Sequence, residues 1–244
     1  MVRLALLLAG GGGDLREAVA PGDEAFAAID YTVALERYSG ALGAHPAEPE
    51  ILWRMARAYV CMAEVEEGTV RAEHLARGEA CARECISADS TRGEGHTWLA
   101  AALGYLALDA GTGRKLELSR ELDREAHRAL AINADDDAAL SILGSFYRAL
   151  GNVGWLERAM ASVFVGSVPR GGYAEAEAAL THAVMIAPDV MRHRYELGIL
   201  YLDMGRRDDA RRSLEAAAAL PVRTAIDRPR LAKIHELLEG LLRR

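Results

Sequence analysis

The stretch Leu197–Pro221, which reads LGILYLDMGRRDDARRSLEAAAALP, contains two short periodic segments separated by a glycine. In the first segment Leu197 and Tyr201 stand four positions apart, so they lie on the same face of a helix, one turn from each other. Gly205 follows this segment, and glycine is the favoured residue just past a helix end. The segment therefore predicts a helix that ends at this glycine, on which Gly198 leaves room for a close neighbour.

The second segment of the same stretch carries the complementary pattern. Ala210, Leu214 and Ala217 recur at helical spacing, and Pro221 ends the periodic run. The two alanines provide a groove that a neighbouring helix can enter, and Leu214 fills the space between them. The whole stretch thus predicts two antiparallel helices joined by a tight turn.

Four earlier stretches repeat this pattern with more drift, and internal repeats of this kind decide the fold. Their clearest parts are Ala34–Ala41, Leu52–Tyr59, Trp98–Tyr105 and Leu143–Tyr147. A final amphipathic stretch, Leu231–Leu242, is expected to cap the exposed end of the stack. Five hairpins and a cap predict an all-α fold, a superhelix (α-solenoid) like that of tetratricopeptide repeat (TPR) proteins. Residues 1–22 are expected to be flexible or partly helical, and residues 23–244 to form one TPR-like domain.

The interval between the paired helices varies from unit to unit. It is nine positions from Tyr201 to Ala210, but 17 to 29 positions in the three units that precede. We therefore expect these units to carry inserted helices. The longest interval contains residues 151–172, where apolar residues follow Trp155 near helical spacing, so an extra helix docked on the solenoid is predicted there.

Residues around these intervals follow the pattern of a known family. They are Leu52–Ala58, His96, Trp98, Gly113, Lys115, Leu143–Gly144, Trp155–Arg158, Phe164, Pro169, Tyr173, Pro188 and Ala219–Pro221. Together they resemble the regulator of microtubule dynamics family, and the resemblance runs from about Ile51 to Leu238. It implies a TPR-like domain that binds proteins, in a family linked to microtubules and, in some members, to mitochondria.

The composition indicates a protein with its own core and gives no support to nucleic-acid binding. The chain is 51% hydrophobic and 27% charged, with 36 acidic residues, 29 basic residues and a net charge of −7. A nucleic-acid partner would require a basic stripe. The nearest cluster, Arg206–Arg212, is interrupted by Asp208 and Asp209. We expect no nucleic-acid partner.

The cysteines and the hydropathy of the chain indicate the cellular compartment in which the protein is expected. Cys61, Cys81 and Cys85 are odd in number and lack the spacing of a disulfide framework, which favours a reducing environment. No stretch approaches the roughly 18 apolar residues that a membrane span needs, so no integral membrane segment is expected. We predict a cytoplasmic protein. The short apolar run Leu4–Ala9 leaves export after an N-terminal signal as the alternative.

No residue pattern typical of catalysis, of a metal or of a cofactor is present in the sequence. Gly10–Gly13 is followed by Asp14 instead of the Gly-Lys-Ser/Thr that a phosphate-binding loop needs. Cys81, Cys85 and His74 supply too few ligands for structural zinc, so the two cysteines are expected to pack in the core. We therefore expect no enzymatic activity, no metal and no cofactor.

A concave surface is the remaining candidate site. In a TPR superhelix the first helix of each pair lines the inner side, and residues offset from its packing ridge face a partner. The predicted groove consists of Trp53, Arg57, His96, Leu99, Leu103, Ser141, Ser145, Arg148, Arg192, Tyr195 and Ile199.

The predicted function is that of a protein-binding scaffold. Arginine pairs with carboxylates through two parallel hydrogen bonds, so the partner is expected to be a protein or peptide with acidic groups. The alternative is an accessory protein that binds a small molecule or lipid in a groove closed by the inserted helices. An apolar cavity would favour this alternative, whereas an open, arginine-lined groove would favour the scaffold.

Overall fold

The computed structural model describes residues 11–152, 169 and 171–243, and within these ranges the regular structure is entirely α-helical. The helices are α1 (Gly11–Ala27), α2 (Tyr31–Ala44), α3 (Pro49–Ala63), α4 (Gly68–Ala88), α5 (Gly93–Asp109), α6 (Thr112–Ile132), α7 (Asp137–Asn152), α9 (Tyr173–Ile186), α10 (Met191–Asp203), α11 (Arg207–Ala218) and α12 (Asp227–Leu242). The predicted helix around Trp155 lies outside the described residues.

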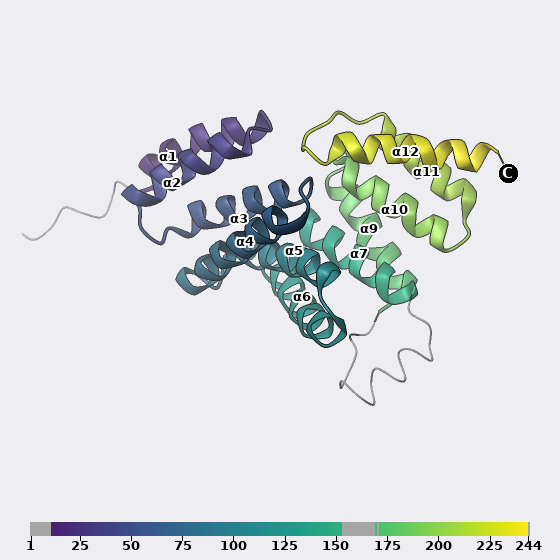
Figure 1. Ribbon diagram of the computed structural model, residues 1–244, viewed down its shortest axis with the longest axis horizontal. Helices are drawn as coiled ribbons and strands as arrows, with labels where there is room; N and C mark the ends of the chain where they lie inside the picture. Colours follow the sequence, from purple (N-terminus) through teal and green to yellow (C-terminus); the bar gives the residue numbers. More distant parts are fainter. Residues whose placement is uncertain (1–10, 153–168, 170, 244) are drawn as a thin grey trace, which may run out of the picture.

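Among the described residues, neighbouring helices form five hairpins, and the last helix covers the end of the stack (Figure 1). The pairs are α1 with α2, α3 with α4, α5 with α6, α7 with α9, and α10 with α11. Helix α12 packs on α11 and touches α10. The predicted all-α, TPR-like superhelix with a C-terminal capping helix is confirmed.

The extra residues of the second and third hairpins are themselves helical. Helices α4 and α6 are each 21 residues long, whereas α11 has 12 residues. Only residues 64–67 link α3 to α4, and only residues 110 and 111 link α5 to α6. The long intervals in these two units therefore lengthen the second helix at its N-terminal end.

Helix α1 is the partner of α2, and the repeat pattern of α1 is weak in the sequence. Val19 of α1 is buried against α2, and the Tyr38 hydroxyl donates a hydrogen bond of 2.6 Å to Asp23 Oδ1. Helix α1 crosses residue 23, the expected start of the TPR-like domain. That residues 23–244 form a single domain stays a prediction.

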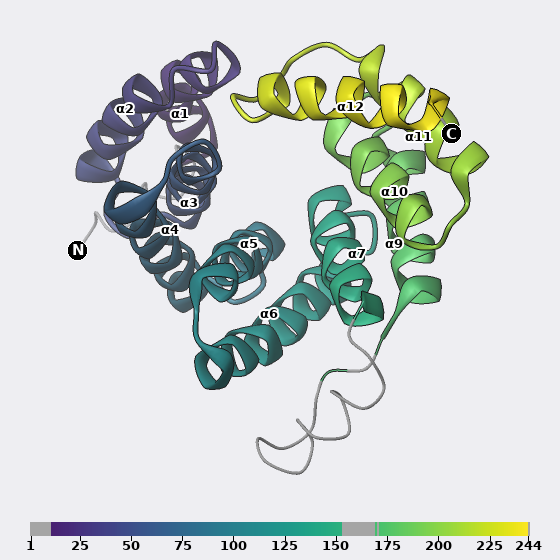
Figure 2. The same cartoon turned by 45° about the vertical axis from the view of Figure 1, so that its right-hand side comes forward.

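The hairpins curve around a common centre. Figure 2 shows α3, α5, α7 and α10 on the inner side, with α4, α6, α9 and α11 outside them. The curve brings the last part of the chain back to the first. The backbone N–H of Ala225, in the loop before α12, donates a hydrogen bond of 3.0 Å to the Tyr31 hydroxyl, across 194 residues. This contact between Tyr31 and Ala225 is called the seam below.

Two glycines allow the paired helices to approach each other closely. A Cβ atom added at Gly198 of α10 would lie 2.8 Å from the Leu214 side chain of α11. One added at Gly144 of α7 would lie 2.4 Å from Leu180 of α9. Real Cβ atoms do not come this near to their neighbours, so the spacing of these pairs depends on glycine. The close neighbour that the sequence predicts beside Gly198 is present, and it is Leu214.

Replacing Gly198 by alanine is expected to destabilise the protein. The added methyl group overlaps Leu214, and overpacking of this kind costs about 1–3 kcal/mol. Alanine favours the helix by about 1 kcal/mol over glycine, so a loss despite this gain identifies the overlap. Urea unfolding measures the change in the free energy of unfolding.

Gly40 provides the matched control. It lies inside α2, is exposed, and has no atom within 4 Å of the position its Cβ would take. Gly40→Ala should therefore raise the free energy of unfolding by about 0.5–1 kcal/mol. If both substitutions stabilise the protein equally, the close approach of α10 to α11 is not as described.

Candidate interaction surface on the inner side

Arg57 of α3 lies between aromatic rings and a carboxylate. Its guanidinium carbon is 3.8 Å from the centre of the Phe26 ring and 5.1 Å from that of Trp53. Its Nη2 atom is 3.5 Å from Asp23 Oδ1, and 23% of the side chain is exposed. A cation stacked on aromatic faces keeps its edge available for hydrogen bonding. Arg57 thus presents a positively charged group held in place from the side of α1.

Arg148 of α7 is paired with acids of the next inner helix, α10. Its Nη1 atom donates a hydrogen bond of 2.9 Å to Asp203 Oδ2. Its Nη2 atom is 3.7 Å from Glu196 Oε2, and a quarter of the side chain is exposed. These pairs join two neighbouring first helices on the inner side.

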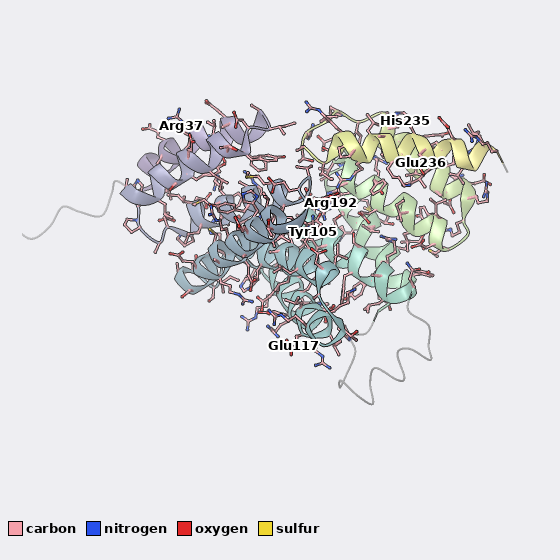
Figure 3. All side chains as sticks on the ribbon, in the orientation of Figure 1. Arg37, Tyr105, Glu117, Arg192, His235 and Glu236 are labelled. Carbon is pink, nitrogen blue, oxygen red and sulfur yellow. The ribbon has the colours of Figure 1, made fainter. Side chains whose placement is uncertain are left out.

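Arg192 of α10 crosses to the opposite part of the superhelix. Its Nη1 atom donates a hydrogen bond of 3.2 Å to Oε1 of Glu64, which caps the C-terminal end of α3 and lies 128 residues away in the chain. The Tyr105 hydroxyl of α5 donates to the same oxygen, and Figure 3 shows Tyr105 and Arg192 side by side. Burial raises the pKa of Tyr105. The pKa of Arg192 is raised by Tyr105 and then by Glu64 and Glu196, against burial, which lowers it.

The three arginines share an unsatisfied group. The Nε atoms of Arg57, Arg148 and Arg192 are buried and have no hydrogen-bond partner among the described residues. The buried hydroxyl of Ser141, on α7, is also without a partner there. Trp53 Nε1 and Glu196 Oε2, on the same surface, likewise lack a partner there. Buried polar groups are normally satisfied, so several left over on one surface call for an explanation, and a bound partner is one. These three residues are called the inner arginines below.

The other residues of the predicted groove are more deeply placed. His96, Leu99 and Leu103 are at most 2% exposed, and both leucines belong to the core. The two ring nitrogens of His96 pair with Glu125 Oε2 at 2.7 Å and with the Ser90 carbonyl oxygen at 3.1 Å. Helix α5 contacts α3, α4, α6 and α7, so most of its circumference is covered. These three side chains offer no surface to a partner in this structure.

The remaining predicted residues lie nearer the surface or near the inner arginines. The Ser145 hydroxyl donates a 3.0 Å hydrogen bond to the carbonyl of the buried Ser141. Trp53, Tyr195 and Ile199 are half-buried. The Tyr195 ring lies 5.7 Å from the guanidinium carbon of Arg230, on α12. The inner arginines and the acids paired with them thus form the charged part of this surface, and the half-buried rings border it.

Sequence reasoning missed the acids that engage these arginines. Glu64 belongs to a run of acids at a helix end, a pattern typical of solvated side chains, yet its side chain is only 4% exposed. Asp23 and Glu196 likewise stand out by nothing in the local sequence. The one available signal is charge balance, because partly buried arginines on an inner surface require carboxylates nearby.

A cavity of about 710 Å³ lies close to the seam. It is lined by residues of the α3–α4 loop, α4, the end of α5 and the start of α12, namely Glu64, Val65, Glu66, Glu67, Gly68, Arg71, Ala72, Asp109, Ile226 and Pro229. Charged side chains make up half of this lining. A second cavity, of about 470 Å³, lies where the α4–α5 loop meets the α6–α7 loop, and its charged lining residues are mostly acidic too.

Comparisons with known proteins agree with this architecture. The chain matches the family described as regulator of microtubule dynamics protein 1-3 over residues 20–242. It is 27% identical to regulator of microtubule dynamics protein 3 of Xenopus laevis over 191 residues, covering 78% of this chain and 41% of that protein. It is 23% identical to protein 2 of Mus musculus over 198 residues, covering 80% and 48%. The chain thus spans less than half the length of these relatives.

A solved structure supports the fold. A thermophilic TPR protein of Thermus thermophilus superposes with a TM-score of 0.66 at 20% sequence identity, covering 94% of this chain and 100% of that one. At this identity the likeness establishes the helical-repeat architecture and says nothing about partners.

The cysteines pack against neighbouring helices. Cys85 is fully buried and its thiol lies 3.5 Å from the Pro49 carbonyl oxygen, while Cys81 is half-buried beside the core. Burial raises the pKa of Cys81 to about 11 and that of Cys85 to about 12. In the described ranges no three His, Cys, Asp or Glu side chains gather as metal ligands.

We expect both thiols to react slowly with iodoacetamide in the folded protein. The thiolate is the reactive form, and at pH 8 a thiol with a pKa of about 11 carries about a hundredfold less thiolate than one at its ordinary value. Mass spectrometry of peptides after timed alkylation measures each rate, with the urea-unfolded chain as the control. Equal rates in the folded and unfolded chains would show that the thiols are not buried.

Proposed function

The chain belongs to the regulator of microtubule dynamics family, and we propose that it is a non-enzymatic scaffold whose inner side binds an acidic segment of a protein partner. The observation that carries the proposal is the set of inner arginines, each with a buried Nε donor that lacks a partner among the described residues. A carboxylate accepts two parallel hydrogen bonds from the Nε and Nη atoms of one guanidinium. An acidic side chain is therefore the group that best completes this surface.

The position of the arginines favours an extended or helical segment over a single small molecule. Arg57, Arg148 and Arg192 stand on three different inner helices, α3, α7 and α10. Aromatic rings accompany them, since Trp53 lies beside Arg57 and Tyr195 lies one turn from Arg192. Arginine with partly exposed aromatic residues is the usual composition of the residues that dominate binding energy at protein interfaces.

A small molecule or lipid is less well supported as the ligand. An apolar cavity would favour it, but charged residues such as Glu66, Arg71 and Asp109 make up half of the lining of the cavity near the seam. The acidic residues in the lining of both cavities also disfavour anionic ligands there. The scaffold is therefore the function that these residues support best.

The location and the larger partner are also proposals. We propose a cytoplasmic location, which the three free cysteines support. No helix in the described ranges combines the length and the apolarity that a membrane crossing requires. We propose microtubules as a candidate source of the acidic segment, on the basis of the family description alone.

The double variant Arg57→Gln/Arg148→Gln is expected to weaken binding of a fluorescein-labelled oligoglutamate peptide by at least about tenfold, because two charge-assisted hydrogen-bond donors are lost. Glutamine keeps two of the three methylene groups of the stem, and its planar amide replaces the guanidinium group that lies over Phe26. Fluorescence anisotropy at low salt measures the affinity, and co-sedimentation with assembled microtubules measures whether that partner responds in the same way.

Arg37→Gln/Arg212→Gln provides the control, since it removes the same charge from exposed side chains of α2 and α11. Its affinity should stay within about twofold of the unmodified chain. If the two double variants bind the peptide equally, the inner side is not the binding surface. Binding that persists with an oligolysine peptide would contradict the preference for acidic groups.

A further inference from the structure

Glu64 occupies an unfavourable place for a carboxylate. It is the residue that caps the C-terminal end of α3, where the helix dipole concentrates negative partial charge and disfavours an anion. Its side chain is only 4% exposed, so it has lost most of its hydration. The Tyr105 hydroxyl and Arg192 compensate it. A buried ion pair of this kind is weak evidence for a role in stability, so the position of Glu64 calls for another explanation.

The pairing of Glu64 with Arg192 is incomplete. Only the Nη1 atom of Arg192 donates to Glu64, at 3.2 Å, while the Nε atom is buried without a partner among the described residues. Once Glu64 has moved away, a carboxylate arriving along the inner side could use Nε together with an Nη atom and form the stronger two-bond arrangement. Exchange of one carboxylate for the other would therefore favour the incoming group.

Space exists for the displaced side chain. Glu64 also lines the cavity near the seam, whose lining includes Ile226 and Pro229 at the start of α12. The side chain can turn toward this cavity, where Arg71 is the cation that could receive it among the acids of the lining. Its departure would break the contact between α3 and α10, while the hydrogen bond between Tyr31 and Ala225 would still join the ends of the superhelix.

We propose that Glu64 is an internal competitor that occupies Arg192 in the free protein and is displaced by a carboxylate of the bound segment. This inference rests on the proposed function. A ligand with a single carboxylate gains little from the exchange, because it must first break the pair of Glu64 with Arg192. A segment whose other acids bind Arg57 and Arg148 at the same time gains enough binding free energy to displace Glu64. Glu64 thereby makes the inner side selective for segments with several acidic groups.

The substitution Glu64→Gln tests this inference directly. It removes the competing charge and keeps the shape of the side chain, so the oligoglutamate peptide should bind about tenfold more tightly. The same change made in an Arg192→Gln background should not alter the affinity, because Arg192, for which Glu64 and the peptide compete, is then absent. Anisotropy titrations of the four proteins form a double-mutant cycle.

Tyr105→Phe supplies a second variant that leaves both charges in place. It removes one of the two donors that hold Glu64, so it should tighten peptide binding in the same direction by a smaller factor, about two- to threefold. This variant keeps the test decisive if Glu64→Gln folds poorly, which far-UV circular dichroism and a thermal melt would reveal.

The outcomes separate this inference from the proposed function. If Arg57→Gln/Arg148→Gln weakens binding while Glu64→Gln and Tyr105→Phe leave it unchanged or weaken it, Glu64 is a structural partner of Arg192 and the competitor role is overturned. If none of the arginine substitutions affects binding, the proposed function itself fails. Tighter binding in Glu64→Gln that persists without Arg192 would show that the gain comes from general charge.

Discussion

The structure depends on one constraint, that a helical hairpin cannot bury its apolar face by itself. Each pair meets through small residues, as where Gly198 lies against Leu214 and Gly144 against Leu180. The apolar surface left over is covered by the next hairpin, so the first helices touch one another from α3 to α10. Since the second helices lie outside, the stack curves and the first helices face the centre (Figure 2). The inner side is thus a consequence of how the hairpins are buried.

Curvature of this kind brings together residues that are distant in the chain. The seam joins Tyr31 to Ala225, and the pair of Glu64 with Arg192 spans 128 residues. A local sequence pattern carries no trace of either contact, because each depends on the accumulated rotation of several hairpins. The chemical character of the inner side therefore arises only when the superhelix is complete, whereas each hairpin can be recognised separately.

This difference explains how much could be predicted from the sequence. The spacing of Leu197, Tyr201, Ala210 and Leu214 predicts a hairpin, because helix packing leaves a periodic pattern. The same periodicity marks three arginines on inner helices, and in the structure each of them pairs with an acid of the chain. It fails in α5, where neighbours cover almost every face, so that His96, Leu99 and Leu103 have the right phase and still lie in the core. The acids were missed because solvated and buried glutamates look alike in a sequence.

On the proposed function, the charge distribution would make the inner side selective. The chain carries a net charge of −7, so its outer surface repels an acidic partner at long range, and the arginines attract it only where they are concentrated. Each inner arginine is also already engaged by an acid of the chain, Arg57 by Asp23, Arg148 by Asp203 and Arg192 by Glu64. A partner must therefore replace interactions that the free protein already makes, which lowers affinity for any single acidic group. Weak attraction at each position combined with engagement at several favours long acidic segments over isolated anions, because the contributions of several linked contacts accumulate in one binding event.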